Sequence, residues 1–358
     1  MAKFSEVLTI VNGRNQKQVV CDDGKYPIYG SGGIMGYAND YICKAETVVI
    51  GRKGSINKPI FVETPFWNVD TAFGLCANSE KLNPKYLYYF CEKFDFEKLN
   101  TTVTIPSLTK SNLLNVEIPL PNLEKQKQIV ELLDKITSLI SLRKQQLVKL
   151  DELVKAQFAN TFENDANFHT DYMENLSEFV TVGIANSATH AYAEHGVVML
   201  RNQNIKENHL DDTELVYIEP KFADKYKSKK LEANDILVTR TGYPGIACVV
   251  PQKYAGSQTF TTLIIRLKKG TNASSCYICH YINSSHGKKY VSGTKVGVAQ
   301  QNFGAKVLAK MPVIVPPIEL QNQFATFVAR IDQQKQTVQQ SLEKLELMKK
   351  ALMQEYFG

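Results

Sequence analysis

"PNLEKQKQI" at residues 121–129 returns as "PPIELQNQF" at residues 316–324, and this repeat decides how the chain is organised. The offset of 195 residues continues without a gap, so that Leu133 meets Val328 and Phe162 meets Phe357. Self-similarity that holds register over this length indicates an internal duplication. The identical positions in the two stretches are Pro121, Glu124, Gln126 and Gln128 in the first copy and Pro316, Glu319, Gln321 and Gln323 in the second.

Weaker echoes precede each repeated segment. "FSEVLTIVNG" from Phe4 resembles "LSEFVTVG" from Leu176, and "TVVIGRKG" from Thr47 resembles "DILVTRTG" from Asp235. Their offsets drift, as expected where loops have been gained or lost. The chain is therefore two copies of one unit, each a variable globular part followed by a long regular segment.

The regular segments have the apolar spacing of coiled-coil helices, with steps of four and three residues. Pro121 and Pro316 mark the predicted helix starts, and each helix should run about 35 residues, or roughly 50 Å. Arg143 and Lys335 interrupt the apolar seam, as polar residues that fix register often do. The seam positions are Ile129, Leu133, Ile136, Ile140, Leu147, Leu150 and Val154, then Phe324, Val328, Ile331, Val338, Leu342 and Leu345.

Chain connectivity then predicts the architecture. The first helix leads from the first globular part to the second, and the other leaves the second with length enough to return, so a pair of them would be antiparallel. The fold class is mixed α/β, with two globular α/β domains, an antiparallel two-helix coiled coil and a pseudo-twofold internal repeat. The predicted boundaries are 1–120 and 163–312 for the globular domains, with 121–162 and 313–358 for the helices. Strands are expected at 46–51, 234–240 and 261–267, and a helix after Asn83 and Pro84.

Composition indicates a globular chain with an anionic partner among its options. The formal charge is +6, and 44% of the residues are hydrophobic. No apolar run approaches the roughly 20 residues of a membrane span, and the N-terminus does not look like a secretory signal, so we expect a cytoplasmic protein that does not act at a membrane. The seven cysteines are odd in number and scattered, which favours reduced core residues over disulfides.

Two local motifs have chemical readings that the sequence does not favour. Gly30, Gly32, Gly33 and Gly36 in "YPIYGSGGIMGY" match neither G-x-G-x-x-G nor a phosphate loop, so they predict turns with positive backbone angles. Cys276, Cys279 and His280 spell the C-x-x-C-H signature of haem attachment. That attachment normally follows export, and no second cysteine pair suits zinc, so Cys279 is expected to pack one face of a short helix.

An enzymatic site is hard to find in this sequence. A DNA amino-methyltransferase would need a cofactor loop and an [NDS]-P-P-[FYW] segment, and "NPKY" at Asn83 lacks the second proline. Neither G-x-S-x-G nor H-E-x-x-H occurs, and the six histidines suggest no metal cluster. We therefore predict no catalytic residue, no metal ligand and no cofactor on this chain. A self-sufficient methyltransferase or nuclease with an unrecognised site, and a plain coiled-coil scaffold, remain the alternatives.

The order of variable domain, repeated helix, variable domain, repeated helix resembles the DNA specificity subunit of type I restriction-modification systems. The resemblance covers essentially the whole chain and is carried by "IPLPNLEKQKQIVELLDKI", "VIVPPIELQNQFATFVARI" and the run "YPIYGSGGIMGYANDY…TVVIGRKGSI". Asn322 and Phe324 depart from the usual helix pattern. The resemblance implies that each variable domain reads one half of a split sequence in double-stranded DNA. It also implies two partner methyltransferase subunits, which carry S-adenosylmethionine and methylate adenine, and restriction subunits that could add ATP-driven translocation and cleavage.

Candidate contact residues follow from charge and hydrogen-bonding chemistry. Arginine and lysine suit phosphates or guanine edges, and asparagine or glutamine can pair with adenine. In the first domain the predicted DNA-binding residues are Tyr29, Tyr37, Arg52, Lys53, Ser55 and Lys58. In the second they are Arg201, Asn202, Gln203, Arg240, Tyr243, Gln300, Gln301 and Asn302. The residues predicted to begin the docking platform for partner subunits are Glu124, Gln126, Glu319 and Gln321.

Overall fold

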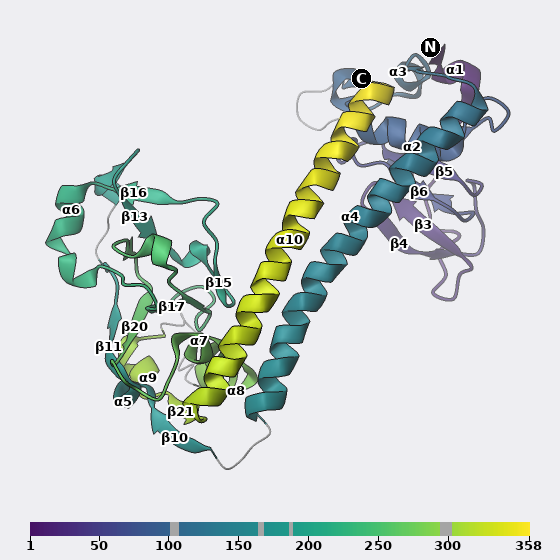
Figure 1. Ribbon diagram of the computed structural model, residues 1–358. Coiled ribbons are helices and arrows are strands. Elements are labelled where there is room, and N and C mark those ends of the chain that lie inside the picture. Colours follow the sequence, from purple (N-terminus) through teal and green to yellow (C-terminus); the bar gives the residue numbers. More distant parts are fainter. Residues whose placement is uncertain (101–106, 164–167, 186–188, 294–302) are drawn as a thin grey trace. The chain divides into compact units, whose positions relative to one another are not determined.

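The two repeated segments form the longest helices of the protein, α4 (Leu123–Phe158) and α10 (Ile318–Phe357) (Figure 1). Asn122 caps α4, because its side chain accepts a hydrogen bond of 2.9 Å from the backbone N–H of Lys125. The helices therefore begin just beyond Pro121 and Pro316 rather than at them, which corrects the predicted starts. A π-helical turn, Ala159–Glu163, follows α4.

The structure is a computed structural model that describes residues 1–100, 107–163, 168–185, 189–293 and 303–358. The chain divides into two compact units. Unit 1 comprises Met1–Gln146 and Val338–Gly358, and unit 2 comprises Leu147–Thr337. Each unit thus contains one globular head together with part of α4 and part of α10.

The head of unit 1 is built on two small sheets. The larger is antiparallel, in the order β2 (Leu8–Asn12), β8 (Ala72–Ala77), β5 (Thr47–Gly51) and β6 (Ile60–Val62). The smaller has the order β4 (Gly33–Ala38), β3 (Tyr26–Gly30) and β7 (Trp67–Asn68). The remaining elements are β1 (Ala2–Lys3), α1 (Phe4–Val7), α2 (Pro84–Lys93), η1 (Phe96–Leu99), α3 (Lys110–Leu114) and β9 (Glu117–Ile118).

Apolar side chains of α2 form the core of unit 1. Leu87 and Phe90 are buried in one cluster with Val48 and Ile50 of β5. The same cluster takes in Ile129 and Leu133 from α4, and Met353 and Phe357 from α10. The head and both helix segments therefore share one hydrophobic core.

Unit 2 repeats this plan. Its antiparallel sheet has the order β11 (Ser177–Val182), β20 (Leu263–Leu267), β17 (Ile236–Val238) and β18 (Ala247–Val249). A second sheet has the order β12 (Tyr192–Ala193), β16 (Val216–Ile218), β13 (Val197–Leu200) and β19 (Gln258–Thr259). Two strand pairs join β10 (His169–Tyr172) to β21 (Pro312–Val315) and β14 (Ile205–Lys206) to β15 (His209–Leu210).

The short helices complete the head of unit 2. Phe158 of α4, Phe162 of the π-helical turn and Phe324 of α10 form one aromatic cluster with Tyr277 of α7. The helices are α5 (Met173–Leu176), α6 (Pro220–Lys225), α7 (Ser275–Asn283), α8 (Ser285–Gly293) and α9 (Ala305–Ala309), with the 3₁₀ turns η3 (Thr189–Ala191), η4 (Asn202–Asn204), η5 (Lys227–Lys229) and η6 (Gln252–Tyr254).

The two long helices run antiparallel within each unit. In unit 1, Lys144 of α4 pairs with Glu346 of α10 at 2.9 Å, whereas Ile129, earlier in α4, shares a core with Phe357 at the end of α10. In unit 2, Asp151 forms an ion pair with Lys335, and Phe158 packs on Phe324 with 5.4 Å between ring centroids. The antiparallel pairing and the mixed α/β class are therefore confirmed.

Local predictions from the sequence are largely confirmed as well. The expected strands appear as β5, β17 and β20, and the expected helix as α2, whose N-cap Asn83 accepts from Lys85 and Tyr86. The glycine-rich stretch forms the hairpin β3–β4, in which Gly33 and Gly36 have positive φ values of +118° and +157°. The predicted positive angles at Gly30 and Gly32 are wrong, because Gly30 continues the extended strand β3 and the hairpin takes its positive angle at Gly33, the residue after Gly32. Cys279 is buried in α7, and desolvation raises the pKa of its thiol. A buried neutral thiol of this kind is a core residue and a poor nucleophile.

Candidate DNA-recognition surface

In unit 1, the predicted basic residues lie on a tight turn directly after β5. The backbone N–H of Arg52 donates to Thr71 at 2.8 Å, and its carbonyl accepts from Leu108 at 2.9 Å, so the turn is held from both sides. Gly54 has a φ of +78°, a conformation that side-chain-bearing residues rarely adopt. The exposed side chains of Arg52, Lys53 and Ser55 therefore project from a fixed backbone.

The glycine hairpin approaches this turn. A Cβ placed on Gly51 would stand 3.0 Å from the Cβ of Ser31, at the tip of the β3–β4 hairpin. Tyr37 of β4 is 47% exposed and is available to a ligand. Tyr29 is less available, because its ring packs edge-on against Phe66 at 5.3 Å between centroids and is half-buried. Lys58 is exposed a few residues beyond the turn.

Unit 2 carries a matching turn directly after β17. Gly242 has a φ of +75°. The Thr239 hydroxyl donates to the carbonyl of Tyr243 at 2.6 Å and accepts from the backbone N–H of Ile246 at 2.9 Å. These bonds fix the loop and leave Tyr243 84% exposed at its tip. The order Arg, polar residue, positive-φ glycine is therefore the same in both heads, at Arg52–Lys53–Gly54 and at Arg240–Thr241–Gly242.

The second predicted group in unit 2 lies against that turn. Asn202, in η4, donates from its side-chain amide to the Thr241 hydroxyl at 2.9 Å. Arg201 donates to the backbone carbonyl of Glu214 at 2.8 Å, and Gln203 donates to the Glu214 carboxylate at 3.2 Å. The structure thus brings together residues that lie some forty positions apart in the sequence.

Three buried polar atoms around this turn have no hydrogen-bond partner within the described part of the chain. They are Nε of Arg201, Oδ1 of Asn202 and Nε of Arg240. Leaving a buried polar group unpaired costs about 1–3 kcal/mol, and such atoms often mark functional sites. The cluster holds both donors and an acceptor, as the edges of bases do. Gln300, Gln301 and Asn302, also predicted for this surface, lie outside the described residues.

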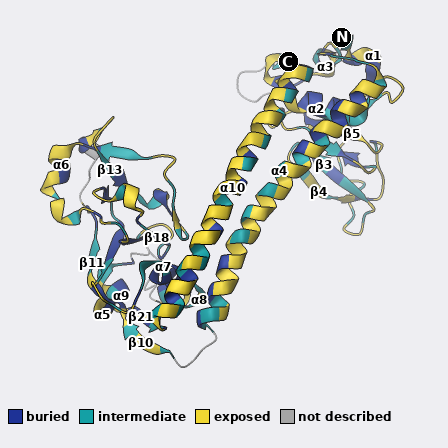
Figure 2. Cartoon of the chain, viewed as in Figure 1, coloured by how far each residue is buried: buried dark blue, intermediate teal, exposed yellow. Residues whose placement is uncertain are grey.

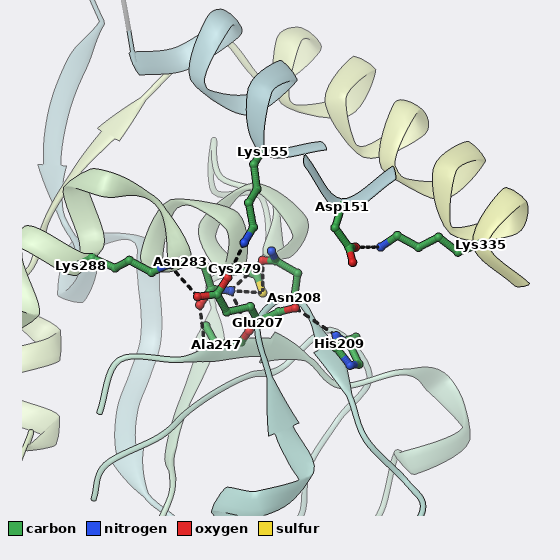
Figure 3. A network of polar contacts seen from close by, with 10 residues as sticks. All are labelled: Asp151, Lys155, Glu207, Asn208, His209, Ala247, Cys279, Asn283, Lys288 and Lys335. Carbon is green, nitrogen blue, oxygen red and sulfur yellow. Dashed lines mark hydrogen bonds and ion pairs between the residues drawn. The ribbon is translucent and has the colours of Figure 1, made fainter. Parts of the chain in front are cut away.

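A polar network ties the surrounding segments of unit 2 together (Figure 3). Glu207, between β14 and β15, accepts from Lys155 of α4 at 2.9 Å and from Lys288 of α8 at 2.6 Å. Burial raises the pKa of Glu207, but the hydrogen bonds from the two lysines outweigh it and hold the pKa below its usual range. Asn283 of α7 donates to Asn208 at 2.7 Å. The segment that follows η4 is thereby fixed to α4, α7 and α8.

Sequence reasoning missed three residues at this surface. Thr241 accepts a hydrogen bond from Asn202. Glu214 accepts hydrogen bonds from Arg201 and Gln203. Lys288 lines the same cleft as Tyr243. The echo of "TVVIGRKG" in "DILVTRTG" places Thr241 opposite Lys53, so that alignment could have found it. Glu214 and Lys288 lie in segments with no such echo.

The predicted docking residues divide into two pairs. Glu124 and Glu319 are exposed in the first turns of α4 and α10. Gln126 and Gln321 are 0% exposed and fully engaged in hydrogen bonds within their own units. The docking prediction for these two glutamines is therefore corrected, because a buried side chain offers no surface to a partner.

The described ranges contain neither a metal-binding cluster nor a membrane-spanning helix. No group of three or more histidine, cysteine, aspartate or glutamate side chains there is placed to hold a metal ion. None of the helices in those ranges has the length and hydropathy of a membrane span.

The chain is a duplicated α/β protein, and each of its two heads carries a matching turn that contains an arginine. This is the class of protein that presents two related surfaces. The chain belongs to the type I restriction modification DNA specificity domain family, because the model of that family matches residues 1–152 and 148–347. Members of this family are specificity subunits, the non-catalytic DNA-recognition components of restriction-modification complexes. This confirms the resemblance found in the sequence and the expectation of a non-enzymatic subunit.

Individual relatives agree with this assignment. The chain is 22% identical over 333 residues to the type I restriction enzyme MjaVIII specificity subunit of Methanocaldococcus jannaschii, covering 86% of this chain and 75% of that protein. The crystal structure of the type I system S subunit from M. genitalium has a similar fold, with a TM-score of 0.63 at 14% identity over 100% of this chain and 95% of that one. A structure described for complex assembly and conformational transition of the type I system gives a TM-score of 0.63 at 13% identity, covering 99% and 96%.

Proposed function

We propose that this chain gives a type I restriction-modification complex its DNA target, with each head reading one half of a split sequence. The observation that carries the proposal is the matching pair of turns at Arg52–Gly54 and Arg240–Gly242, each following an equivalent buried strand. Two related surfaces on one chain suit a target of two separated parts. The long helices that join the heads would set the distance between the half-sites.

The chemistry of each surface suits DNA. Arg52, Lys53 and Lys58 would bind phosphates or guanine edges of one half-site. In the second head, Arg240 would do the same, and the side-chain amide of Asn202 has the donor and acceptor pattern that pairs with adenine. Tyr243, on its fixed loop, would pack against a sugar or base.

We propose further that two methyltransferase subunits dock on the long helices and bring S-adenosylmethionine with them. Exposed positions recur along α4 (Figure 2). Support for docking comes from the leucines among them. Several exposed apolar side chains on one helix are more typical of a binding site than of a solvated surface. The exposed leucines are Leu132, Leu139, Leu142 and Leu153, with exposures of 38%, 43%, 58% and 46%. Restriction subunits would add to the same complex, and the compartment would be the cytoplasm, with the DNA.

The decisive experiment is single-molecule methylome sequencing of cells with and without this chain. We expect a bipartite adenine methylation mark that disappears when the chain is deleted and returns when it is restored. Unchanged methylation at every bipartite motif would contradict the proposal.

A second experiment separates the rival functions. The purified chain is incubated alone with DNA and labelled S-adenosylmethionine, and separately with a divalent metal. We expect neither methylation nor cleavage until the methyltransferase subunits are added. Activity of the chain alone would favour an enzyme, and failure to select any sequence from randomised duplexes in the presence of the partners would favour a scaffold.

A further inference from the structure

Gln126 joins three segments of unit 1. Its side-chain oxygen accepts from the backbone N–H of Asn83 at 2.8 Å. Its side-chain nitrogen donates to the carbonyl of Lys81 at 3.0 Å and to the carbonyl of Pro121 at 2.8 Å. Asn83 caps α2, the central helix of the head, and Pro121 lies two residues before the start of α4. One buried amide therefore connects the head to the helix that leaves it.

Gln321 makes the same three bonds in unit 2. It accepts from the backbone N–H of Ser274 at 2.9 Å and donates to Asn272 and Pro316, both at 2.8 Å. Ser274 caps α7, the counterpart of α2, and Pro316 precedes α10. The contacts therefore fall on equivalent backbone positions in the two halves, namely the N-cap, the residue two before it and the proline five before the glutamine.

A tyrosine in each head reinforces the junction. The hydroxyl of Tyr86 donates to the carbonyl of Pro119 at 3.0 Å, and that of Tyr277 donates to the carbonyl of Ile314 at 2.6 Å. Both acceptors lie in the segment that leads into the long helix. The two junctions have thus kept the same hydrogen bonds while the loops of the heads diverged.

Such a junction fixes the orientation of the head relative to the long helix. Apolar packing stabilises contact without fixing one orientation, whereas hydrogen bonds weaken steeply when their angles change. Removing the glutamine amide would leave an N–H and two carbonyls without these partners at partly buried positions, which is unfavourable because a polar group withdrawn from water needs a hydrogen bond. A rotation of the head on its helix would break the same bonds, so they resist that rotation.

We propose that Gln126 and Gln321 are positioning residues that fix the angle of each reading head on its long helix. By holding that angle, they make the complex reject DNA in which the two half-sites are separated by the wrong number of base pairs. This inference rests on the proposed function. The glutamines would contribute to spacer selection without touching DNA themselves.

The test uses the full chain assembled with its methyltransferase subunits. Binding and methylation are measured on duplexes that carry both half-sites, with the spacer at its native length or changed by one or two base pairs. We expect the wild-type complex to prefer the native spacer by at least about tenfold, or about 1.4 kcal/mol, over a change of one base pair. In Gln126→Met and Gln321→Met the preference should fall below about threefold, while substitutions within each half-site remain as costly as in the wild type.

The matched controls are Gln128→Met and Gln323→Met, which alter exposed glutamines two residues further along the same helices. They should keep the wild-type spacer preference. A folded Gln126→Met complex with undiminished spacer preference, or one that loses half-site and spacer discrimination equally, would overturn the inference. A wild-type complex with no bipartite target would instead overturn the proposed function.

A measurement on the wild-type chain guards against variants that fail to fold. The backbone N–H groups of Asn83 and Ser274 donate hydrogen bonds to the two glutamines. Their amide hydrogen exchange should therefore be at least about a hundredfold slower than that of exposed loop amides. Exchange of both amides at the rate of the exposed loops would show that the junctions open freely, and would overturn the inference without any substitution.

Discussion

The ring of Phe357, near the end of α10, packs on the ring of Tyr86 in α2 with 4.9 Å between their centroids. Phe162 and Tyr277 stand at the same 4.9 Å in unit 2. The sequence offset of 195 residues that relates Phe162 to Phe357 is the one that relates the two glutamines. Each head is therefore held twice, by the start of one long helix and by the end of the other.

Removing either ring should loosen its unit. Phe357→Ala and Phe162→Ala delete aromatic side chains that are 8% and 1% exposed, and we expect each to lower the free energy of unfolding by about 3–5 kcal/mol. Thermal unfolding followed by circular dichroism measures the effect. Glu355→Ala, at an exposed position of α10, serves as the control, and equal melting temperatures for Phe357→Ala and that control would contradict the packing role.

The basic turn of unit 1 should contribute to DNA binding mainly through charge. Replacing both Arg52 and Lys53 by alanine should weaken binding of the assembled complex and reduce the slope of log K against log salt by about 2. Both side chains are exposed, so the melting temperature should stay near that of the wild type. Titrations at several salt concentrations test this, with Lys3→Ala as a control that removes an exposed charge outside the turn. An unchanged slope would show that Arg52 and Lys53 do not contact the DNA.

The exposed leucines of α4 should govern assembly and leave folding intact. Leu139→Glu places a charge at an exposed position, so the stability of the chain should change by less than about 0.5 kcal/mol. Burial of a leucine stabilises an interface by about 1.5–3 kcal/mol, so co-purification with the methyltransferase subunit should fall at least about tenfold. Ser138→Glu adds the same charge at the preceding exposed position. If both variants retain the partner equally, the docking surface lies elsewhere.

His280 should make unit 2 sensitive to acid. Burial beside Phe158 and Phe324, with a smaller effect of the charge on Lys335, lowers the pKa of His280 to about 4. In the unfolded chain the pKa is about 6.5, so below pH 6.5 the unfolded state binds a proton that the folded state does not. The stability that this neutral imidazole contributes is complete above pH 6.5, and about 3 kcal/mol is lost as the pH falls to 4.

Urea unfolding at several pH values measures this loss. The variant His280→Gln should have a flatter dependence between pH 6.5 and 4 than the wild type. His195→Gln, at an exposed histidine, should keep the wild-type slope. If the free energy of unfolding falls equally with pH in the wild type and in His280→Gln, this imidazole does not cause the loss of stability in acid.

The sequence predicted the parts of the structure that depend on periodicity. Leu133 and Ile136 of α4 are buried on the predicted seam, and β5 and β17 appear where short apolar runs predicted them. Heptad and strand periods are local properties and can be read from neighbouring residues. The antiparallel pairing followed from the duplication together with chain connectivity, because the first long helix leads from one head to the other and the second has the length to return.

What the sequence did not predict depends on contacts between distant positions. The repeat marked Gln126 and Gln321 as special but could not say that they point inward, because glutamine in the first turn of a helix is usually exposed. The approach of Asn202 to Thr241 depends on a contact between η4 and the turn after β17, two segments that lie 39 positions apart in the sequence.

The leucines left uncovered on α4 also bear on how the cell must handle this chain. A subunit made in excess of its partners would expose the leucines of α4 to chaperones and proteases, which act on exposed apolar surface. We therefore expect its lifetime to follow the supply of methyltransferase subunits, so that reader and modifier accumulate in matched amounts.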